Sequence, residues 1–316
     1  MTTVVTADDI EAAARRLHGH VRRTPILPLE LGALGTHAHL TLKLELLQHS
    51  GSFKARGAFN SLLSLPVPAT GLIAASGGNH GAAVAFAAQS LGHTAEIFVP
   101  ALASAAKIAR IESFGARVTV VPGAYADALV AADKRMNETG ALAIHAYDAP
   151  TTVAGQGTLA RELDAQCTML DTVLVAVGGG GLIGGIAAWF GGRVRVVGVE
   201  PVNCPTLQRA FAAKEPVDVD VSGIAADSLG ARRIGTLPFA IAKDFVEGVV
   251  LVEDDAIRAA QHVLWRDLRL ASEPGGATAL AALLSGAYKP ALGEKVAVIL
   301  CGGNVDPATL NAVTTE

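Results

Sequence analysis

The sequence predicts an α/β protein built from mainly parallel sheets that are flanked by helices. Short apolar runs alternate with stretches of helical periodicity along the 316 residues, which is the order expected of repeated βα units. Glycine stands just past several helical stretches, where it commonly ends a helix. The expected strands span residues 40–44, 72–75, 96–99, 118–121, 143–145, 173–177, 194–199 and 296–300.

The helical stretches fill the gaps between these strands, and their order suggests two lobes. The first helix is expected over Ala7–Leu17, with Thr6 as its N-cap. Further helices are expected over residues 53–65, 81–91, 105–114, 125–138 and 277–284. No linker-like segment marks a boundary, so we infer it from the order of the βα units. Residues 66–147 are expected to form a small lobe inserted into a larger lobe of residues 1–65 and 148–316.

The composition excludes several classes of protein. Hydrophobic residues make up 51% of the chain and charged residues 17%, which excludes a disordered protein. The net charge is −4 without a basic block, so we expect neither nucleic acid nor a membrane surface as a partner. No apolar run reaches the ~18 residues of a membrane span, and the first ten residues do not resemble a signal peptide. Three cysteines without CxxC spacing fit a reduced, cytoplasmic protein without structural zinc.

The strongest local signal is Lys54, within the segment Gly-Ser-Phe-Lys-Ala-Arg-Gly-Ala of residues 51–58. This lysine falls in the first turn of a predicted helix, where the positive helix end disfavours a cation. The same field and partial burial would lower the pKa of the amine and make it a better nucleophile. The alternative is a solvated lysine beside a glycine turn, and the segment by itself leaves the two interpretations equally weighted.

A second loop, residues 76–81, reads Ser-Gly-Gly-Asn-His-Gly between a strand and a helix. Its glycines and the helix N-terminus expose backbone N–H groups, which suit a carboxylate or a phosphate. Asn79 can both donate and accept at a ring substituent. By itself the loop favours a tight turn with Ser76 or Asn79 as a cap. We interpret His80 as a hydrogen-bonding histidine without a catalytic role.

Four consecutive glycines at residues 178–181 follow an apolar strand. A simple βα turn needs only one or two, and four lose much backbone entropy on folding. The run therefore favours close approach of the backbone to a phosphate, without identifying which phosphate. With Gly184 the turn also satisfies GxGxxG, and Glu200 ends the next strand about twenty residues on. A nicotinamide-dependent oxidoreductase is therefore an alternative.

Two further residues are candidates for the same site. Cys301 ends the last strand, and side chains at strand carboxyl ends point toward the usual ligand crevice of an α/β sheet. The alternative is a buried, inert cysteine. Glu273 precedes a glycine pair and an alanine-rich helix, so it could cap that helix or face a cofactor ring. We favour a site role, because the glycine pair indicates close approach of the backbone.

Together these loops resemble the fold-type II pyridoxal-phosphate (PLP) enzymes, specifically the serine/threonine dehydratase and serine racemase group. The resemblance runs from Arg-Thr-Pro at residues 23–25, through Lys-Leu-Glu at 43–45, to Cys-Gly-Gly-Asn at 301–304. Each motif is weak, but their order and spacing are specific. The resemblance implies a two-lobed fold with PLP between the lobes and a homodimer. It also implies β-elimination of L-threonine or L-serine to the 2-oxo acid plus ammonia.

The resemblance also implies roles for individual residues. Lys54 would form the Schiff base with PLP and move the α-proton. The implied cofactor-binding residues are Phe53, Lys54, Asn79, Gly178, Gly179, Gly180, Gly181, Glu273 and Cys301. The implied substrate-binding residues are Ser76, Gly77, Gly78, Asn79 and His80. No metal site is expected, because Glu200 alone offers too few oxygen ligands.

Two positions bear on the choice of reaction. Racemases of this group carry a serine at the position of Gly77 as a second base, and glycine has no proton to give. At the pyridine nitrogen the group commonly has serine, and Cys301 replaces it here. A neutral thiol does not protonate the ring nitrogen as a carboxylate would, so loss of the β-hydroxyl is favoured over a long-lived carbanion. A racemase and a non-catalytic PLP-binding protein of the same fold are the alternatives.

Overall fold

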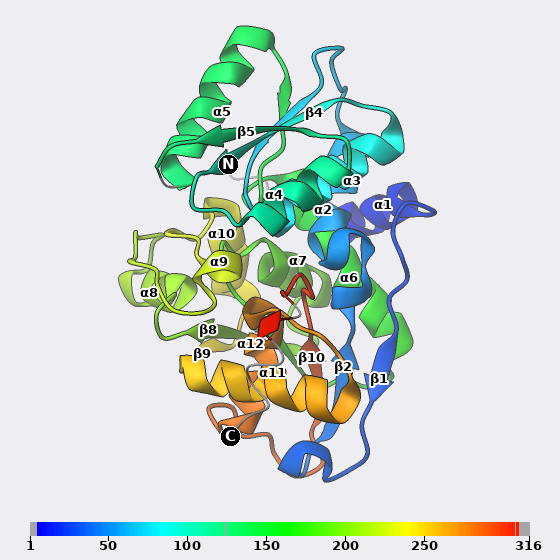
Figure 1. Ribbon diagram of the computed structural model, residues 1–316. Helices are drawn as coiled ribbons and strands as arrows, with labels where there is room; N and C mark the ends of the chain where they lie inside the picture. The colour runs from blue at the N-terminus through cyan, green and yellow to red at the C-terminus, as the bar shows by residue number, and fades with distance from the viewer. Residues whose placement is uncertain (1–4, 124, 307, 310–316) are drawn as a thin grey trace.

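The computed structural model describes residues 5–123, 125–306 and 308–309, and its strands form two sheets (Figure 1). One sheet has six strands in the order β1-β2-β10-β7-β8-β9, and the other has four in the order β5-β4-β3-β6. Every neighbouring pair is parallel except β1 with β2. The expected α/β class with mainly parallel sheets is therefore confirmed.

The strands lie close to their expected positions. The larger sheet comprises β1 (Ile26–Pro28), β2 (His39–Lys43), β7 (Thr172–Ala176), β8 (Arg195–Pro201), β9 (Gly248–Val252) and β10 (Lys295–Ile299). The smaller sheet comprises β3 (Leu72–Ala75), β4 (Ala95–Pro100), β5 (Arg117–Val121) and β6 (Leu142–Ala143). The sequence-based prediction missed β1 and β9, which are the two edge strands of the larger sheet. Strand β1 has only three residues, whereas the apolar run of β9 was overlooked. The prediction for residues 143–145 was also wrong in extent, since β6 ends at Ala143.

Twelve α-helices are assigned within the described residues. They are α1 (Ala7–Leu17), α2 (Lys54–Ser64), α3 (Asn79–Leu91), α4 (Ala105–Ser113), α5 (Tyr125–Thr139), α6 (Pro150–Gln166), α7 (Gly181–Phe190), α8 (Thr206–Ala213), α9 (Ala226–Leu229), α10 (Thr236–Phe245), α11 (Asp254–Leu268) and α12 (Pro274–Leu284). The Thr6 cap of α1 is confirmed, because its side chain accepts from the Asp9 backbone while the Asp9 side chain accepts from the Thr6 backbone. Helix α3 begins two residues before its expected start, directly after the loop of residues 76–78.

The two sheets support the proposed division of the chain. All four strands of the smaller sheet fall within residues 66–147, and we propose that this segment is the inserted lobe. In Figure 1 it forms the upper part of the molecule with α3, α4 and α5. Helix α2 lies before this segment, but Ala55, Phe59 and Leu62 belong to the same hydrophobic cluster as β3 and α3. Helix α2 therefore packs into the core of the small lobe and connects it to the large one.

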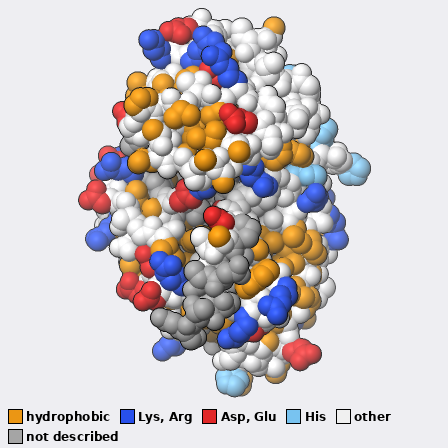
Figure 2. Space-filling model, viewed as in Figure 1, with side chains coloured by type: hydrophobic (Ala, Val, Ile, Leu, Met, Phe, Trp, Pro, Cys, Tyr) orange, Lys and Arg blue, Asp and Glu red, His pale blue; other side chains and the backbone are white. Residues whose placement is uncertain are grey.

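The topology brings the candidate loops to one place. Loops that follow β3, β7 and β10 contain residues 76–78, 177–180 and 300–304, and each leaves the carboxyl end of a parallel strand. In open α/β sheets ligands bind at these ends. Charged side chains of both signs are interspersed on the face shown in Figure 2. No helix among the described residues has the length and apolar character needed to span a bilayer.

Candidate active site

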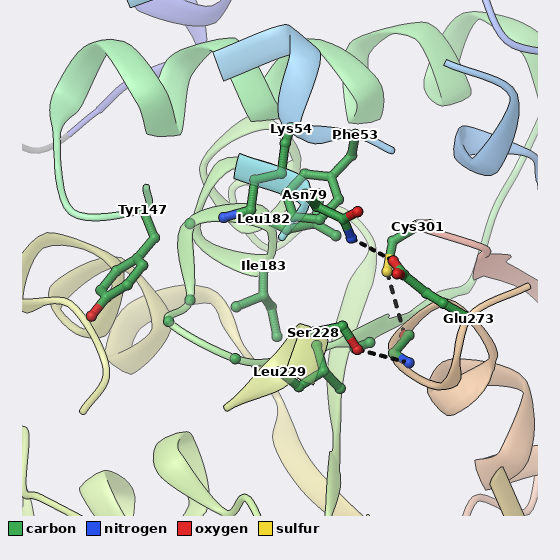
Figure 3. A pocket seen from close by; sticks show the side chains of 16 residues that line it. Phe53, Lys54, Asn79, Tyr147, Leu182, Ile183, Ser228, Leu229, Glu273 and Cys301 are labelled. Carbon is green, nitrogen blue, oxygen red and sulfur yellow. Dashed lines mark hydrogen bonds between the residues drawn. The ribbon is translucent and has the colours of Figure 1, made fainter. Parts of the chain in front are cut away.

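A pocket opens where these loops meet (Figure 3). Its walls come from the start of α2, the start of α3, the tetraglycine turn, the segment around Ser228, the start of α12 and the end of β10. The pocket therefore lies between segments of the proposed small and large lobes. Of the residues predicted to bind cofactor, all nine line it: Phe53, Lys54, Asn79, Gly178, Gly179, Gly180, Gly181, Glu273 and Cys301.

Lys54 is placed by backbone pairing between two distant segments. Phe53 donates its N–H to the carbonyl of Cys301 at 3.1 Å, and Ser52 forms an antiparallel bridge with Gly302. The Lys54 amine donates to the carbonyl of Ala146 at 2.7 Å. Burial of the amine lowers its pKa to about 8, so an appreciable neutral fraction is present near neutral pH. The predicted lowering of this pKa therefore agrees with the structure, and burial is its main cause.

A buried ion cluster anchors the helix that carries Lys54. The Arg56 guanidinium contacts Glu45 through two hydrogen bonds of 2.8 and 2.7 Å, and its Nη2 lies 3.0 Å from a carboxylate oxygen of Glu162. Lys43 contacts the other oxygen of Glu162 at 2.5 Å. Removing one member would leave a buried charge without its partner, which is strongly destabilising. The cluster thus holds the first turn of α2 against β2 and α6.

The tetraglycine turn is a cradle that admits no side chains. Gly180 has φ +88°, a left-handed conformation that favours glycine. A Cβ at Gly181 would lie 2.9 Å from Cα of Tyr147, and a Cβ at Gly179 would overlap the Tyr147 ring. The turn leads into the N-terminus of α7, so it exposes backbone N–H groups at a positive helix end. This arrangement fits a phosphate group beside the Lys54 amine.

Glu273 and Cys301 face the same pocket from the large lobe. Glu273 occupies the N-cap position of α12, but its side chain does not cap that helix. It accepts a hydrogen bond of 2.5 Å from Asn79 Nδ2, as Figure 3 shows, and burial raises its pKa to about 7. The thiol of Cys301 donates to the carbonyl of Gly275 at 3.4 Å. Burial also raises the pKa of this thiol, so it is neutral.

The loop of residues 76–80 contributes less to the pocket wall than the sequence predicted. Only Asn79 lines the pocket among its five members. The Ser76 hydroxyl accepts the N–H of Gly78 at 3.2 Å. His80 is buried with its Nε2 2.8 Å from the carbonyl of Ile144, and burial lowers its pKa to about 3. The interpretation of His80 as a neutral, structural histidine fits these contacts, and the substrate-binding role of the loop stays a prediction.

Tyr147, Ser228 and Leu229 are among the lining residues that the sequence analysis did not predict. Tyr147 packs against Gly179 and Gly181 of the tetraglycine turn and Leu229 packs against Gly178, with Ser228 next to Leu229 (Figure 3). Ser228 Oγ accepts the N–H of Gly275 at 3.1 Å, which ties the start of α12 to α9. None of them belongs to a glycine-rich motif. Their positions follow from the packing of loops that are distant in sequence, so no local pattern could reveal them.

The oxidoreductase alternative required Glu200 to bind a ribose hydroxyl, and the contacts of Glu200 contradict that role. Its carboxylate accepts hydrogen bonds from Thr206 Oγ1 at 2.9 Å and from the N–H groups of Leu207 and Gln208 at 2.7 and 3.0 Å. These contacts cap α8, so the carboxylate is not free for a ribose hydroxyl or a metal. Across residues 5–123, 125–306 and 308–309, no group of three His, Cys, Asp or Glu side chains is placed to hold a metal ion.

Residues 17–302 match the family described as pyridoxal-phosphate dependent enzyme. The chain therefore belongs to this family, and PLP is its cofactor. Its two mainly parallel sheets, flanked by helices, have the two-lobed fold-type II arrangement of solved PLP enzymes. The glycine cradle fits the phosphate of PLP, and the buried Lys54 amine fits its reactive aldehyde.

Individual relatives identify the group within the family. The chain is 36% identical to a phenylserine dehydratase of Ralstonia pickettii, over 98% of this chain and 96% of the relative. It is 34% identical to an L-threonine ammonia-lyase of Thermotoga maritima, over 99% of this chain and 79% of the relative. The structure of maize serine racemase superposes with a TM-score of 0.92 at 33% identity, covering 98% of this chain and 96% of that one. Because these relatives include lyases and a racemase, they leave the reaction itself open.

Proposed function

We propose that the protein catalyses PLP-dependent β-elimination of L-threonine or L-serine, which yields the 2-oxo acid and ammonia. The observation that carries this proposal is that Gly77 has no space for a side chain. A Cβ there would lie 2.8 Å from both Ala103 Cβ and Val99 Cγ1, closer than real Cβ contacts. A second base at this position, which the racemases of the group use, is therefore disfavoured, and Lys54 is the base that remains.

The residues around the pocket divide the chemistry between them. When bound, PLP supplies an aldehyde for the substrate amine and a conjugated ring that accepts electrons. Lys54 takes the Cα proton, and its pKa of about 8 provides both the neutral base and the protonated acid near neutral pH. The neutral thiol of Cys301 does not protonate the ring nitrogen, which favours departure of the β-hydroxyl. Phe53 would pack on the ring, and Gly178 to Gly181 would hold the phosphate.

The substrate carboxylate is assigned to the loop that opens α3. We assign the carboxylate to Ser76, Gly77, Gly78 and His80, beside Asn79. The N–H of Ser76 donates to the carbonyl of Phe98 and that of Gly78 to Ser76 Oγ, so the donors we propose are the N–H groups of Gly77 and His80 at the helix N-terminus and the Ser76 hydroxyl. A carboxylate is stabilised there by the helix dipole and by N–H donors. The relatives act on threonine, serine or phenylserine by name, so we propose a β-hydroxy amino acid as the substrate class.

Serine racemisation is the second candidate, because the maize serine racemase has the same fold and a similar sequence. A panel of L-threonine, L-serine and phenylserine should distinguish the reactions when 2-oxo acid, ammonia and D-amino acid are all measured. We expect 2-oxo acid and ammonia in equal amounts and little D-amino acid. D-serine as the main product would overturn the proposal in favour of the racemase.

Lys54→Ala provides the direct test of the proposed base. The variant should lose the visible absorbance of the bound cofactor and nearly all turnover, by about a thousandfold or more, because the amine supplies both the covalent link and the proton transfer. Lys54→Arg is the matched control, since it keeps the positive charge but is not deprotonated in proteins. Full activity of either variant would contradict the mechanism.

We also propose that the protein is a cytoplasmic homodimer without nucleic-acid or membrane partners. The net charge of −4 and the interspersed surface charges in Figure 2 support the absence of nucleic-acid and membrane partners. The homodimer rests on the family resemblance, and the cytoplasmic location rests on the unpaired cysteines. Light scattering of the purified chain tests the oligomeric state. A monomeric mass near 32.2 kDa would contradict the dimer.

A further inference from the structure

The side chain of Asn79 is held from two sides by the large lobe. Its Nδ2 donates to Glu273 Oε1 at 2.5 Å, and its Oδ1 accepts from Asn304 Nδ2 at 2.6 Å. Asn304 Nδ2 also donates to the carbonyl of Ser50 at 2.8 Å. A continuous chain of hydrogen bonds thus runs from the backbone at Ser50 through Asn304 and Asn79 to Glu273.

The order of donors and acceptors along this chain determines the orientation of both amides. The Ser50 carbonyl can only accept, so the Asn304 atom that faces it must be the NH₂ group. That group then also donates to Asn79, which must present its oxygen to Asn304. The remaining Asn79 atom is the NH₂ group, and it meets a carboxylate that accepts. Turning the Asn304 amide over would set its oxygen against the oxygens of Ser50 and Asn79. Turning the Asn79 amide over would set two NH₂ groups together and an oxygen against the Glu273 carboxylate.

The backbone at the start of this chain is adapted to Asn304. Gly51 has φ +80°, and a Cβ at this residue would overlap the Asn304 side-chain oxygen. Ser50 has φ +57°, a left-handed conformation that is unusual for a residue with a side chain. Only glycine at position 51 leaves room for Asn304, so the close packing holds the Asn304 amide beside the Ser50 carbonyl.

One hydrogen of the Asn79 amide has no acceptor within the part of the chain that the structure describes. One Nδ2 hydrogen is used by Glu273, and both hydrogens of Asn304 are used as well. Asn79 lines the pocket between Lys54 and Glu273 (Figure 3). The second Nδ2 hydrogen is therefore available to a ligand atom that accepts a hydrogen bond.

We propose that Asn304 and Glu273 are positioning residues that lock the Asn79 amide with an N–H, and not its oxygen, available to the cofactor. The site then requires an acceptor at this point, and the ionised ring oxygen of PLP is such an acceptor. This inference rests on the proposed contact between Asn79 and the cofactor ring. It adds Asn304, the last residue of the Cys-Gly-Gly-Asn motif, to the residues that determine which form of the cofactor is bound.

Titration of the full-length, cofactor-free chain with two probes tests the proposal. The probes are PLP and 3-O-methyl-PLP, which lacks the ionised ring oxygen, and binding is followed by absorbance. Asn304→Asp keeps the size of the side chain but replaces both donors with acceptors. We expect it to weaken PLP binding about tenfold, the effect of losing one hydrogen bond to a charged group, and to weaken binding of the analogue much less.

A purely packing role gives a different result. Asp is nearly isosteric with Asn, so Asn304→Asp would then resemble the wild type, while Asn304→Ala would be the more damaging change. A general effect of added negative charge would weaken both probes equally. Either outcome would overturn the proposal.

Glu273 provides a second pair of variants in case Asn304→Asp fails to fold. Glu273→Gln keeps an oxygen that can accept from Asn79, whereas Glu273→Leu removes the acceptor. We expect the preference for PLP over the analogue to stay within about threefold of the wild type in Glu273→Gln and to be lost in Glu273→Leu. Equal preferences in the two variants would contradict the proposed lock.

The same measurements separate this inference from the proposed reaction. A wild-type chain that releases ammonia from threonine, with an unchanged probe preference in Asn304→Asp, refutes the lock and leaves the lyase function standing. A chain that shows the expected preferences but releases no ammonia refutes the lyase function and supports the lock.

Discussion

Two glycine-rich turns follow parallel strands in this molecule, and they differ in why they contain glycine. In the tetraglycine turn, added Cβ atoms would meet Tyr147, Pro238 or Leu229, and all four residues line the pocket. In the loop of residues 76–78, no member lines the pocket, and Gly78 has nothing closer than 3.7 Å to an added Cβ. Similar sequence signals thus line the pocket in one case and open a helix beside it in the other.

A methyl group in the cradle should have the largest effect on this comparison. Gly181→Ala would place a Cβ 2.9 Å from Cα of Tyr147 and disturb the N–H groups assigned to the phosphate. We expect PLP affinity to fall about a hundredfold, because at least one hydrogen bond to a charged group is lost in addition to the overpacking. Titration with PLP measures the change, and an affinity within threefold of the wild type would show that the turn does not hold the phosphate.

The pH dependence of binding should distinguish the Lys54 amine, which titrates, from the glycine turn, which does not. The Lys54 amine has a pKa lowered to about 8 by burial, so its neutral, nucleophilic form increases with pH. The rate of PLP capture by the cofactor-free chain should rise about tenfold between pH 7 and pH 9 and then level off. Pyridoxine 5'-phosphate has no aldehyde, so its binding to the non-titrating backbone N–H groups should change little over this range. A flat capture rate would mean that the amine is not the titrating group.

The space available at Gly77, in the loop of residues 76–78, should determine the ratio of racemisation to elimination. Gly77→Ser introduces a Cβ 2.8 Å from Ala103 and Val99, so we expect it to destabilise the fold by about 1–3 kcal/mol. The ratio of racemisation to elimination should rise, and it should rise further when Ala103→Gly provides room. Chiral chromatography and a 2-oxo acid assay measure this ratio. An unchanged ratio in the double variant would remove Gly77 from the account of reaction choice.

The smallest effect is expected at Gly78. Its φ lies outside the left-handed region, and an added Cβ meets only the carbonyl of Asp227, at 3.7 Å. Gly78→Ala should therefore change the free energy of unfolding by less than about 0.5 kcal/mol and PLP affinity by less than about twofold. Thermal unfolding and PLP titration measure these quantities. A loss as large as that in Gly181→Ala would erase the distinction between the two turns.

The accuracy of the sequence-based predictions followed the strength of local patterns. The strand at Leu72–Ala75 and the helix at Ala7–Leu17 match the structure, because one is a fully buried apolar run and the other is a capped amphipathic helix. The strand at Gly248–Val252 is the exception, because its apolar run predicts a strand but was not recognised as one. Tyr147 was missed for another reason, because its place in the pocket depends on a contact with glycines more than thirty residues away.

The sequence by itself determined the fold class and singled out Lys54 and the glycines of residues 178–181, which line the pocket, because helix starts, buried strands and glycine runs are local properties. Only the tertiary structure decided the direction of the Glu273 side chain, the use of Glu200 as a helix cap and the hydrogen-bond chain through Asn304. Each of these features joins residues that are close in space because different strands and helices pack together. The pairing of a donor with an acceptor across such a contact has no signature in either segment alone.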